Sequence, residues 1–239
     1  MSQPFTPLTQ LPNFDPLRMP VLGVDDHLPA VPLERLQPQA LRERFQQSRE
    51  WTPEILRERS FSQREPALAA VLIGIVMREQ PTVLLTQRTA HLSTHSGQVA
   101  FPGGKVDATD RDVVDTALRE SHEEVGLERD QVQVLGTISD YVTGTAFVVT
   151  PVVGLVPASH TLKPNPHEVA SAFEVPLAFL MNPAFHRRHA LEAEGRRREW
   201  FSMPYQDGDE QRFIWGATAG MLRNLYRFLL AEDQATEPT

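Results

Sequence analysis

The sequence contains no cysteine among its 239 residues. Disulfides, a thiolate nucleophile and cysteine-ligated zinc or iron–sulfur sites are therefore excluded. Any metal ion must be bound by carboxylates and histidines. The absence of cysteine also fits a protein of a reducing compartment.

Long apolar runs are also missing. The longest, residues 67–77, is much shorter than the roughly 20 residues with which a helix crosses a bilayer, so we expect it to form a buried strand. The N-terminus lacks the basic start and the apolar stretch of a secretory signal. We therefore expect a cytoplasmic protein with no membrane partner.

Basic residues are the minority charge: 23 Lys and Arg stand against 31 Asp and Glu, for a formal net charge of -8. Nucleic acids and anionic membranes bind through clustered cations that neutralise phosphates, and the sequence has no Lys/Arg stripe. We therefore expect a small-molecule partner and no nucleic acid. A polyphosphate substrate would have to be neutralised by metal ions and a few arginines.

Proline, by contrast, is abundant near the N-terminus. Such crowding opposes regular structure, so residues 1–39 are expected to form an extended arm. Short helices are expected at 40–47 and after Pro53, where proline suits a first helical turn. We divide the chain into three parts: an arm with short helices at 1–65, a compact domain at 66–232 and a tail at 233–239.

The compact domain mixes strand and helix patterns. Residues 68–77 and 82–88 predict a hairpin whose first strand is buried on both faces. Apolar residues at helical spacing predict an amphipathic C-terminal helix over 218–233. This mixture indicates an α+β fold. Further strands are predicted at 131–138, 146–156 and 171–177.

The segment 101–127 carries the chemistry. A helix is predicted from about Asp110, as the N-terminal cap, to Gly126, as the C-terminal stop. One side of this helix is largely apolar, and the roughly opposite side gathers three glutamates: Glu120, Glu123 and Glu124.

Three glutamates on one helical face repel one another, at a cost of about 0.2 to 0.5 kcal/mol for each close pair. A bound divalent cation would turn this repulsion into a net attraction, and hard oxygen ligands suit Mg²⁺ or Mn²⁺. The alternative to a metal site is that the three glutamates simply form a solvated acidic face of the helix, which is the better interpretation of the glutamates taken alone. Arg119 beside Glu120, with Gly103 and Gly104 in a turn before the helix, favours the metal site.

These residues resemble the signature of the Nudix hydrolases: Gly, five residues, Glu, seven residues, then Arg-Glu-apolar-x-Glu-Glu-x-Gly-apolar. The matching positions are Arg119, Glu120, Glu123, Glu124, Gly126 and Leu127. Three features depart from it. Fourteen residues separate Gly104 from Arg119 where thirteen are usual, Arg111 stands where Glu is expected, and Ser121 occupies an apolar position. The resemblance implies a Nudix-type α/β/α sandwich with a mixed sheet.

Residues 84–105 are more specifically similar to the motif of the coenzyme A pyrophosphatase branch of that family. The residues in register are Leu84, Leu85, Thr86, Arg88, Gly97, Phe101, Pro102, Gly103 and Gly104. Thr89 replaces a usual Ser, and Ser93 replaces a usual second Arg. With later stretches included, the resemblance covers about residues 67–230.

The resemblance implies hydrolysis of the pyrophosphate bond of coenzyme A or an acyl derivative, giving 3′,5′-ADP and the (acyl-)4′-phosphopantetheine part. Glu120, Glu123 and Glu124 would bind Mg²⁺ or Mn²⁺, and Arg119 would orient a glutamate. The general base is either a glutamate of the signature or Glu168. Substrate-binding residues would be Arg88, His95, Gly97, Phe101, Gly103 and Gly104.

Several alternatives stay open at this point. His91 and His122 are interpreted as polar surface residues, whereas His95 lies inside the coenzyme A motif. Other Nudix substrates are ADP-ribose, dinucleotides and modified nucleoside triphosphates. Arg111 in place of an acid would suit a catalytically silent nucleotide-binding regulator. Apolar residues in the arm predict a homodimer in which the arm packs across the partner.

Overall fold

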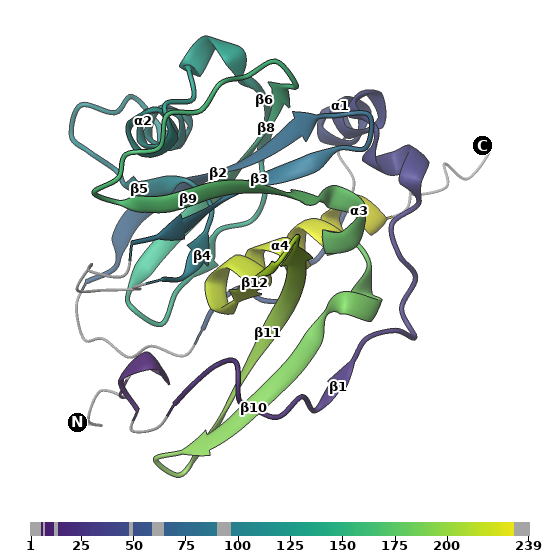
Figure 1. Ribbon diagram of the computed structural model, residues 1–239, viewed down its shortest axis with the longest axis vertical. Coiled ribbons are helices and arrows are strands. Elements are labelled where there is room, and N and C mark those ends of the chain that lie inside the picture. The colour runs from purple at the N-terminus through teal and green to yellow at the C-terminus, as the bar shows by residue number, and fades with distance from the viewer. Residues whose placement is uncertain are drawn as a thin grey trace.

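The structure, a computed structural model, describes residues 6, 8–11, 14–47, 50–58, 65–89 and 97–231. They form two β-sheets and a few helices, with the larger sheet held between helices (Figure 1). This arrangement confirms the expected α+β sandwich. Among the described residues, no helix is long and apolar enough to cross a membrane.

The larger sheet is mixed, with the strand order β4-β3-β2-β8-β6. Its central pair is parallel: β2 (Ala67–Met77) lies beside β8 (Phe147–Pro157) along its whole length. The antiparallel edge strand β6 (Gln133–Thr137) follows β8, and the short β7 (Tyr141–Val142) also pairs with β8. The strands predicted from apolar patterns are therefore confirmed.

The hairpin between β2 and β3 (Thr82–Arg88) is short because the two strands separate after two residue pairs. The space between them is filled by β5 (Gly103–Lys105), which pairs with β2. β4 (Val99–Ala100) pairs with the same edge of β3 beyond the two residue pairs with β2, and β9 (Val169–Pro176) pairs with the opposite edge of β3. This opening of the hairpin places the glycine-rich turn in the middle of the domain.

Both faces of β2 are buried, as its apolar run predicts. On one face Leu72 and Val76 pack with Ala117 and Val125 of helix α2 (Val113–Val125). On the other face, Ile73 belongs to the core that includes α1 (Pro38–Gln46) and α4 (Gly216–Leu230). Figure 1 shows α2 on one side of the large sheet and α4 on the other. The predicted helices at 40–47 and 218–233 are thus confirmed with small shifts of their ends.

A second, antiparallel sheet has the order β1-β10-β11-β12 and was not predicted. Its strands are β1 (Gly23–Val24), β10 (Arg187–Ala193), β11 (Arg196–Asp207) and β12 (Glu210–Trp215). The arginine-rich strands lack a clear apolar alternation, and this hid them. The two-residue turns between them were the available signal: Glu194 and Gly195 both have positive φ, as does Gly208 in the next turn.

The N-terminal arm packs on its own chain, which corrects the expectation of an extended arm without regular structure. It contains β1 and the 3₁₀ helices η1 (Leu8–Gln10) and η2 (Leu33–Leu36). Val31 and Leu36 are buried in the core, and the Tyr226 hydroxyl donates a hydrogen bond to the Pro29 carbonyl (2.9 Å). Backbone hydrogen bonds and core contacts therefore order the described part of the arm despite its many prolines.

The helix expected after Pro53 is wrong. Residues 53–58 are not helical, and Arg57 forms a bridge with Val142. The Ile55 N–H and C=O both bond to the Asn224 side chain, at 3.0 and 2.6 Å. These tertiary bonds hold the segment extended and override its local helical preference. The remaining short elements are η3 (Arg129–Gln131), α3 (Leu177–Leu180) and η4 (Pro183–Phe185).

Candidate active site

The glutamate helix α2 is capped at both ends by its own sequence. Asp112, and not Asp110 as predicted, is the N-cap residue, and its carboxylate accepts a bond from the Asp115 N–H at 2.8 Å. Gly126 ends the helix in the left-handed conformation, with φ of 69°, as predicted. These caps fix where the glutamates sit relative to the turn that precedes the helix.

Asp110 serves a different purpose, because its carboxylate binds the Arg119 guanidinium in a two-pronged ion pair. Arg119 Nε and Nη2 each lie 2.8 Å from an Asp110 oxygen. Thr116 Oγ1 and the Asp107 N–H, each also at 2.8 Å, complete the shell around Asp110. The Arg119 hydrogen bonds hold the pKa of Asp110 well below its usual range, so Asp110 stays charged.

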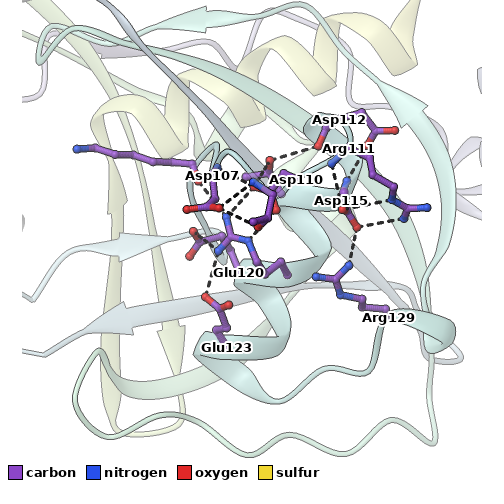
Figure 2. Close-up of polar contacts among 12 residues, drawn as sticks. Asp107, Asp110, Arg111, Asp112, Asp115, Glu120, Glu123 and Arg129 are labelled. Carbon is purple, nitrogen blue, oxygen red and sulfur yellow. Dashed lines mark hydrogen bonds and ion pairs between the residues drawn. The ribbon is translucent and has the colours of Figure 1, made fainter.

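Arg119 uses its remaining donors on the glutamates (Figure 2). Its Nη1 lies 2.9 Å from Glu120 Oε1 and 3.1 Å from Glu123 Oε2. Its Nη2 also donates to the Lys105 carbonyl at 3.0 Å, which ties α2 to β5. Arg119 therefore links Asp110, two glutamates of the helix and the glycine-rich turn.

Glu124 points inward and is buried. Its Oε2 accepts a bond from the Gly103 N–H (3.1 Å), and its Oε1 lies 3.5 Å from Arg88 Nη1. Burial raises the pKa of Glu124 to about 7, although the Gly103 bond and Arg88 oppose this shift. Burial also raises the pKa of Glu120, since the Arg119 contacts compensate only partly.

The two glycines are required because backbone and side chain approach closely here. A Cβ on Gly104 would lie 2.4 Å from the Glu120 carboxyl carbon, and one on Gly103 would lie 2.4 Å from the Ala70 carbonyl oxygen. Only glycine allows β5 to lie between β2 and the glutamate helix. Phe101, two residues earlier, is buried and anchors this turn.

Glu168 reaches the same cluster from the loop before β9. Its carbonyl accepts a bond from the Thr89 N–H at 3.0 Å, which fixes the loop against the end of β3. Its negative charge is close enough to raise the pKa values of Glu120 and Glu124. The loop before β9 therefore places the negative charge of Glu168 within electrostatic range of the glutamates of α2.

The donor set fits a divalent cation by its chemistry, although its side chains are not arranged around one point. Within the part of the chain that the structure describes, no three His, Asp or Glu side chains are placed to hold a metal as they stand. Glu120 and Glu123 turn toward Arg119, and Glu124 turns toward Gly103. Burial raises the pKa of Glu120 and Glu124, and a bound cation would favour their charged forms.

Other residues singled out in the sequence lie apart from this cluster. Arg111 pairs with Asp115 at 3.1 Å, and its side chain is 82% exposed, away from Glu120 (Figure 2). His122 lies 3.5 Å from the exposed Glu128 and is a surface residue. Gly97 forms a turn with φ of 68°. The residues outside the described part of the chain are His91, Ser93 and His95.

Asp110 is the residue that sequence reasoning missed. The spacing could have found it, because five residues separate Gly104 from Asp110, as in the Nudix signature. The extra residue therefore falls between Asp110 and Arg119, and counting backward from Arg119 led instead to Arg111. The acid is present at its expected distance from the glycine, as Asp in place of Glu.

A large cavity adjoins the cluster. Its volume is about 1070 Å³, and it is lined on the catalytic side by Gly103, Gly104, Lys105 and Arg88. The small sheet and the N-terminal arm line the opposite side. No glutamate of α2 lines this cavity, but Arg88 and Gly103, which contact Glu124, do. The space is large enough for a substantial small molecule.

Comparison with known proteins identifies this arrangement. The sequence model described as "NUDIX domain" matches residues 66–203. The chain belongs to the Nudix family. The matched region begins at the residue where we placed the start of the compact domain and ends within β11.

Close relatives carry the same family name. A protein of Enterobacter sp. (strain 638), described as an uncharacterized Nudix hydrolase NudL, is 44% identical over 160 residues, which are 66% of this chain and 80% of the relative. A protein of the same description from Escherichia coli O1:K1 / APEC is 46% identical over 160 residues, with the same two shares. The chain is therefore a Nudix hydrolase acting on pyrophosphate bonds, and such enzymes generally use divalent cations such as Mg²⁺ or Mn²⁺.

Solved structures are also similar to the chain. The binary complex of the C. elegans Ap4A hydrolase has a TM-score of 0.40 and 22% identity, covering 49% of this chain and 85% of that one. The NUDIX domain of Shewanella oneidensis NrtR, complexed with ADP ribose, has a TM-score of 0.38 and 21% identity, covering 48% of this chain and 75% of that one.

Proposed function

We propose that this Nudix enzyme hydrolyses the pyrophosphate bond of coenzyme A or an acyl-coenzyme A. The observation that carries the proposal is the position of the motif at 84–105. Its residues Arg88, Phe101, Gly103 and Gly104 line the cavity, and Arg88 and Gly103 contact Glu124 as well. The segment that resembles the coenzyme A branch thus joins the candidate catalytic glutamates to the substrate space.

In the proposed reaction, a water oxygen bonds to one phosphorus while the bond from that phosphorus to the bridging oxygen breaks. The products are 3′,5′-ADP and the (acyl-)4′-phosphopantetheine part. Divalent cations, when bound, neutralise the charge that develops on the phosphates and position the water. Glu120, Glu123 and Glu124 are the residues that would hold them.

The other residues act around these glutamates. Arg119, fixed by Asp110, keeps Glu120 and Glu123 in place through charge-assisted bonds. Arg88, at 28% side-chain exposure, is available to phosphate oxygens beside Glu124. Glu168 is our candidate to accept the proton of the attacking water, because its charge lies near both Glu120 and Glu124. A signature glutamate is the other candidate base.

The proposed location of the enzyme is the cytoplasm.

A substrate panel tests the proposal. The full chain is incubated with Mg²⁺ or Mn²⁺ and with coenzyme A, an acyl-coenzyme A, ADP-ribose, a dinucleotide or a modified nucleoside triphosphate, and the products are separated by mass. We expect the highest kcat/KM on a coenzyme A compound. A higher kcat/KM on another substrate would reject the coenzyme A proposal, and no turnover of any substrate would favour a silent regulator.

A further inference from the structure

The cavity has two chemically different walls. Beside the glutamate helix, the lining includes Arg88, Lys105 and the two glycines of β5. Across from them, beside polar residues that include Arg188, Arg197 and Arg198, the arm and the small sheet contribute five large apolar side chains. These are Leu8 and Leu22 of the arm, with Trp200, Phe201 and Trp215 of β11 and β12. We call this second set the apolar wall.

The aromatic rings of the apolar wall are already packed on one another. Trp200 stacks on His189, with ring centroids 5.4 Å apart and an angle of 8° between the planes. The Phe14 ring lies 5.7 Å from Trp200 and 5.8 Å from Trp215. Trp200 is only 8% exposed, so it has no open face on which a purine could stack. Trp200, the most buried ring of the wall, therefore offers no base-stacking platform.

The arginines near the apolar wall are also occupied. Arg188 pairs with Asp25 at 3.0 Å, Arg197 with Glu199 at 2.6 Å and Arg198 with Glu194 at 2.6 Å. Each of these arginines thus contacts a carboxylate, and Arg188 shares Asp25 with the buried Arg223. A phosphate group would have to compete with these carboxylates for the arginines. The nucleotide end of coenzyme A, with its additional phosphate, is a poor match for this wall.

We propose that the N-terminal arm and the small sheet form a subsite for the acyl chain of an acyl-coenzyme A. This inference rests on the proposed function and narrows its substrate class. A pyrophosphate held at the glutamates leaves the rest of the substrate to extend through the cavity, and an acyl chain that reaches this wall buries apolar surface against it. Acyl-coenzyme A compounds are then better substrates than free coenzyme A.

Two exposed leucines of the arm provide a matched test. Leu22 is 55% exposed and lines the cavity, whereas Leu33 is 64% exposed and lies outside its lining. Leu22→Asp places a charge on the apolar wall, and Leu33→Asp makes the same change elsewhere on the arm. The experiment measures kcat/KM of each full-length enzyme with Mg²⁺ on free coenzyme A and on acyl-coenzyme A of increasing chain length.

For the unmodified enzyme we expect kcat/KM to increase with chain length. The ratio of kcat/KM on a long-chain compound to that on free coenzyme A should fall about tenfold or more in Leu22→Asp, and it should stay the same in Leu33→Asp. A second variant, Leu22→Trp, should shorten the longest chain that is accepted, and thermal melting shows whether each variant is folded.

Equal kcat/KM at all chain lengths in the unmodified enzyme would overturn the acyl subsite while leaving the coenzyme A activity in place. An unchanged ratio in folded Leu22→Asp would overturn it too, as would an equal loss on ADP-ribose, because the wall would then serve the nucleotide end. Absence of turnover on every coenzyme A compound, with turnover of ADP-ribose, would instead contradict the proposed function itself.

Discussion

The Glu124 side chain is buried and the Glu120 side chain is half-buried, but neither belongs to the hydrophobic core. Replacing either by Gln keeps the side-chain volume and removes the charge that a cation needs. We predict that Glu120→Gln and Glu124→Gln each lower kcat by orders of magnitude at saturating Mg²⁺ without lowering the melting temperature. Near-normal turnover in either variant would show that its carboxylate is not a metal ligand.

Glu128→Gln is the matched control for these variants. The Glu128 side chain is 63% exposed and lies beside His122, outside the cluster. Its replacement should leave both kcat and the melting temperature unchanged. A loss of activity in this control would mean that general surface charge, and no specific ligand, controls the rate.

Asp110 and Arg111 are neighbours in the sequence, but we expect a loss of activity when Asp110 is replaced and no change when Arg111 is replaced. Asp110 holds Arg119 through two bonds, so we predict that Asp110→Asn lowers activity or metal affinity about 10- to 100-fold, as is typical when a supporting partner of a ligand is lost. The Arg111 side chain is 82% exposed and pairs with Asp115 away from the glutamates, so Arg111→Ala should leave kcat/KM unchanged. Mg²⁺ titrations of the rate measure both quantities. The reverse result would place Arg111, and not Asp110, in the site.

At the scale of elements, helix α4 is fixed by a buried polar network. Arg223, 2% exposed, pairs with Asp25 of the arm at 3.0 Å and with Glu54 at 2.8 Å. It also donates to His186 Nδ1 at 3.0 Å, while His186 Nε2 lies 2.8 Å from the Leu180 carbonyl. His186 is therefore neutral, with its proton on Nε2.

This geometry predicts a pH dependence of stability. Burial lowers the pKa of His186 to about 4, so the unfolded chain binds a proton at higher pH than the folded chain does. Stability is then present above the unfolded pKa of about 6.5 and is lost as the pH falls from there toward 4. We predict a loss of about 2 kcal/mol in the free energy of unfolding between pH 7 and pH 5.

Urea unfolding at the two pH values measures this loss, and His186→Gln provides the comparison. Gln can donate to Leu180 and accept from Arg223 but does not titrate, so the pH dependence of this variant should be smaller by the His186 contribution. An equal pH dependence in both proteins would assign it to other groups.

Elements with a strong local sequence pattern were predicted, and elements held by turns or tertiary contacts were not. The strands β2, β3 and β8 and the helices α2 and α4 have strong apolar patterns or caps, and the sequence indicated all of them. The small sheet depends on short turns such as Glu194–Gly195 and on pairing between polar strands, which apolar periodicity does not detect. Segment 53–58 is held by Asn224 and Val142, contacts that no local pattern can reveal.

The candidate site was predictable to a similar degree. The signature identified the glutamates, Arg119 and the two glycines, and the fold brings these residues together. The bond between Asp110 and Arg119 was missed because Asp110 also looked like a helix cap. The apolar wall of the cavity could not be predicted, because it joins the arm to strands more than a hundred residues away.

At the scale of the whole molecule, the arm is part of one folded unit. The homodimer prediction rested on apolar arm residues needing a partner, but Phe14 packs on Trp200 and Trp215 of the same chain. Phe14 therefore needs no partner subunit, and the dimer stays a prediction. Among the apolar residues of the arm, Leu17, Val21, Leu22 and Leu33 are exposed.

We predict that deleting residues 1–39 destabilises the protomer whatever its association state. The deletion removes β1, the buried Val31 and Leu36, and the Asp25 partner of Arg223. Each lost apolar side chain is worth up to about 1.5 to 3 kcal/mol, so the unfolding midpoint in urea should fall at every protein concentration. Unchanged stability of the deletion variant, together with weaker dimerisation in sedimentation, would contradict this prediction. It would support instead a dimer in which the arm packs across the partner. Deleting the tail at 233–239 is the length control.

The central claim is that the glutamate helix and the adjoining motif hydrolyse the pyrophosphate bond of coenzyme A. The most direct measurement follows 3′,5′-ADP and 4′-phosphopantetheine by mass after coenzyme A, Mg²⁺ and enzyme are mixed. We expect both products to form in equal amounts with the unmodified chain and almost no product to form with Glu124→Gln. Equal product formation by the variant, or intact coenzyme A with the unmodified chain, would contradict it.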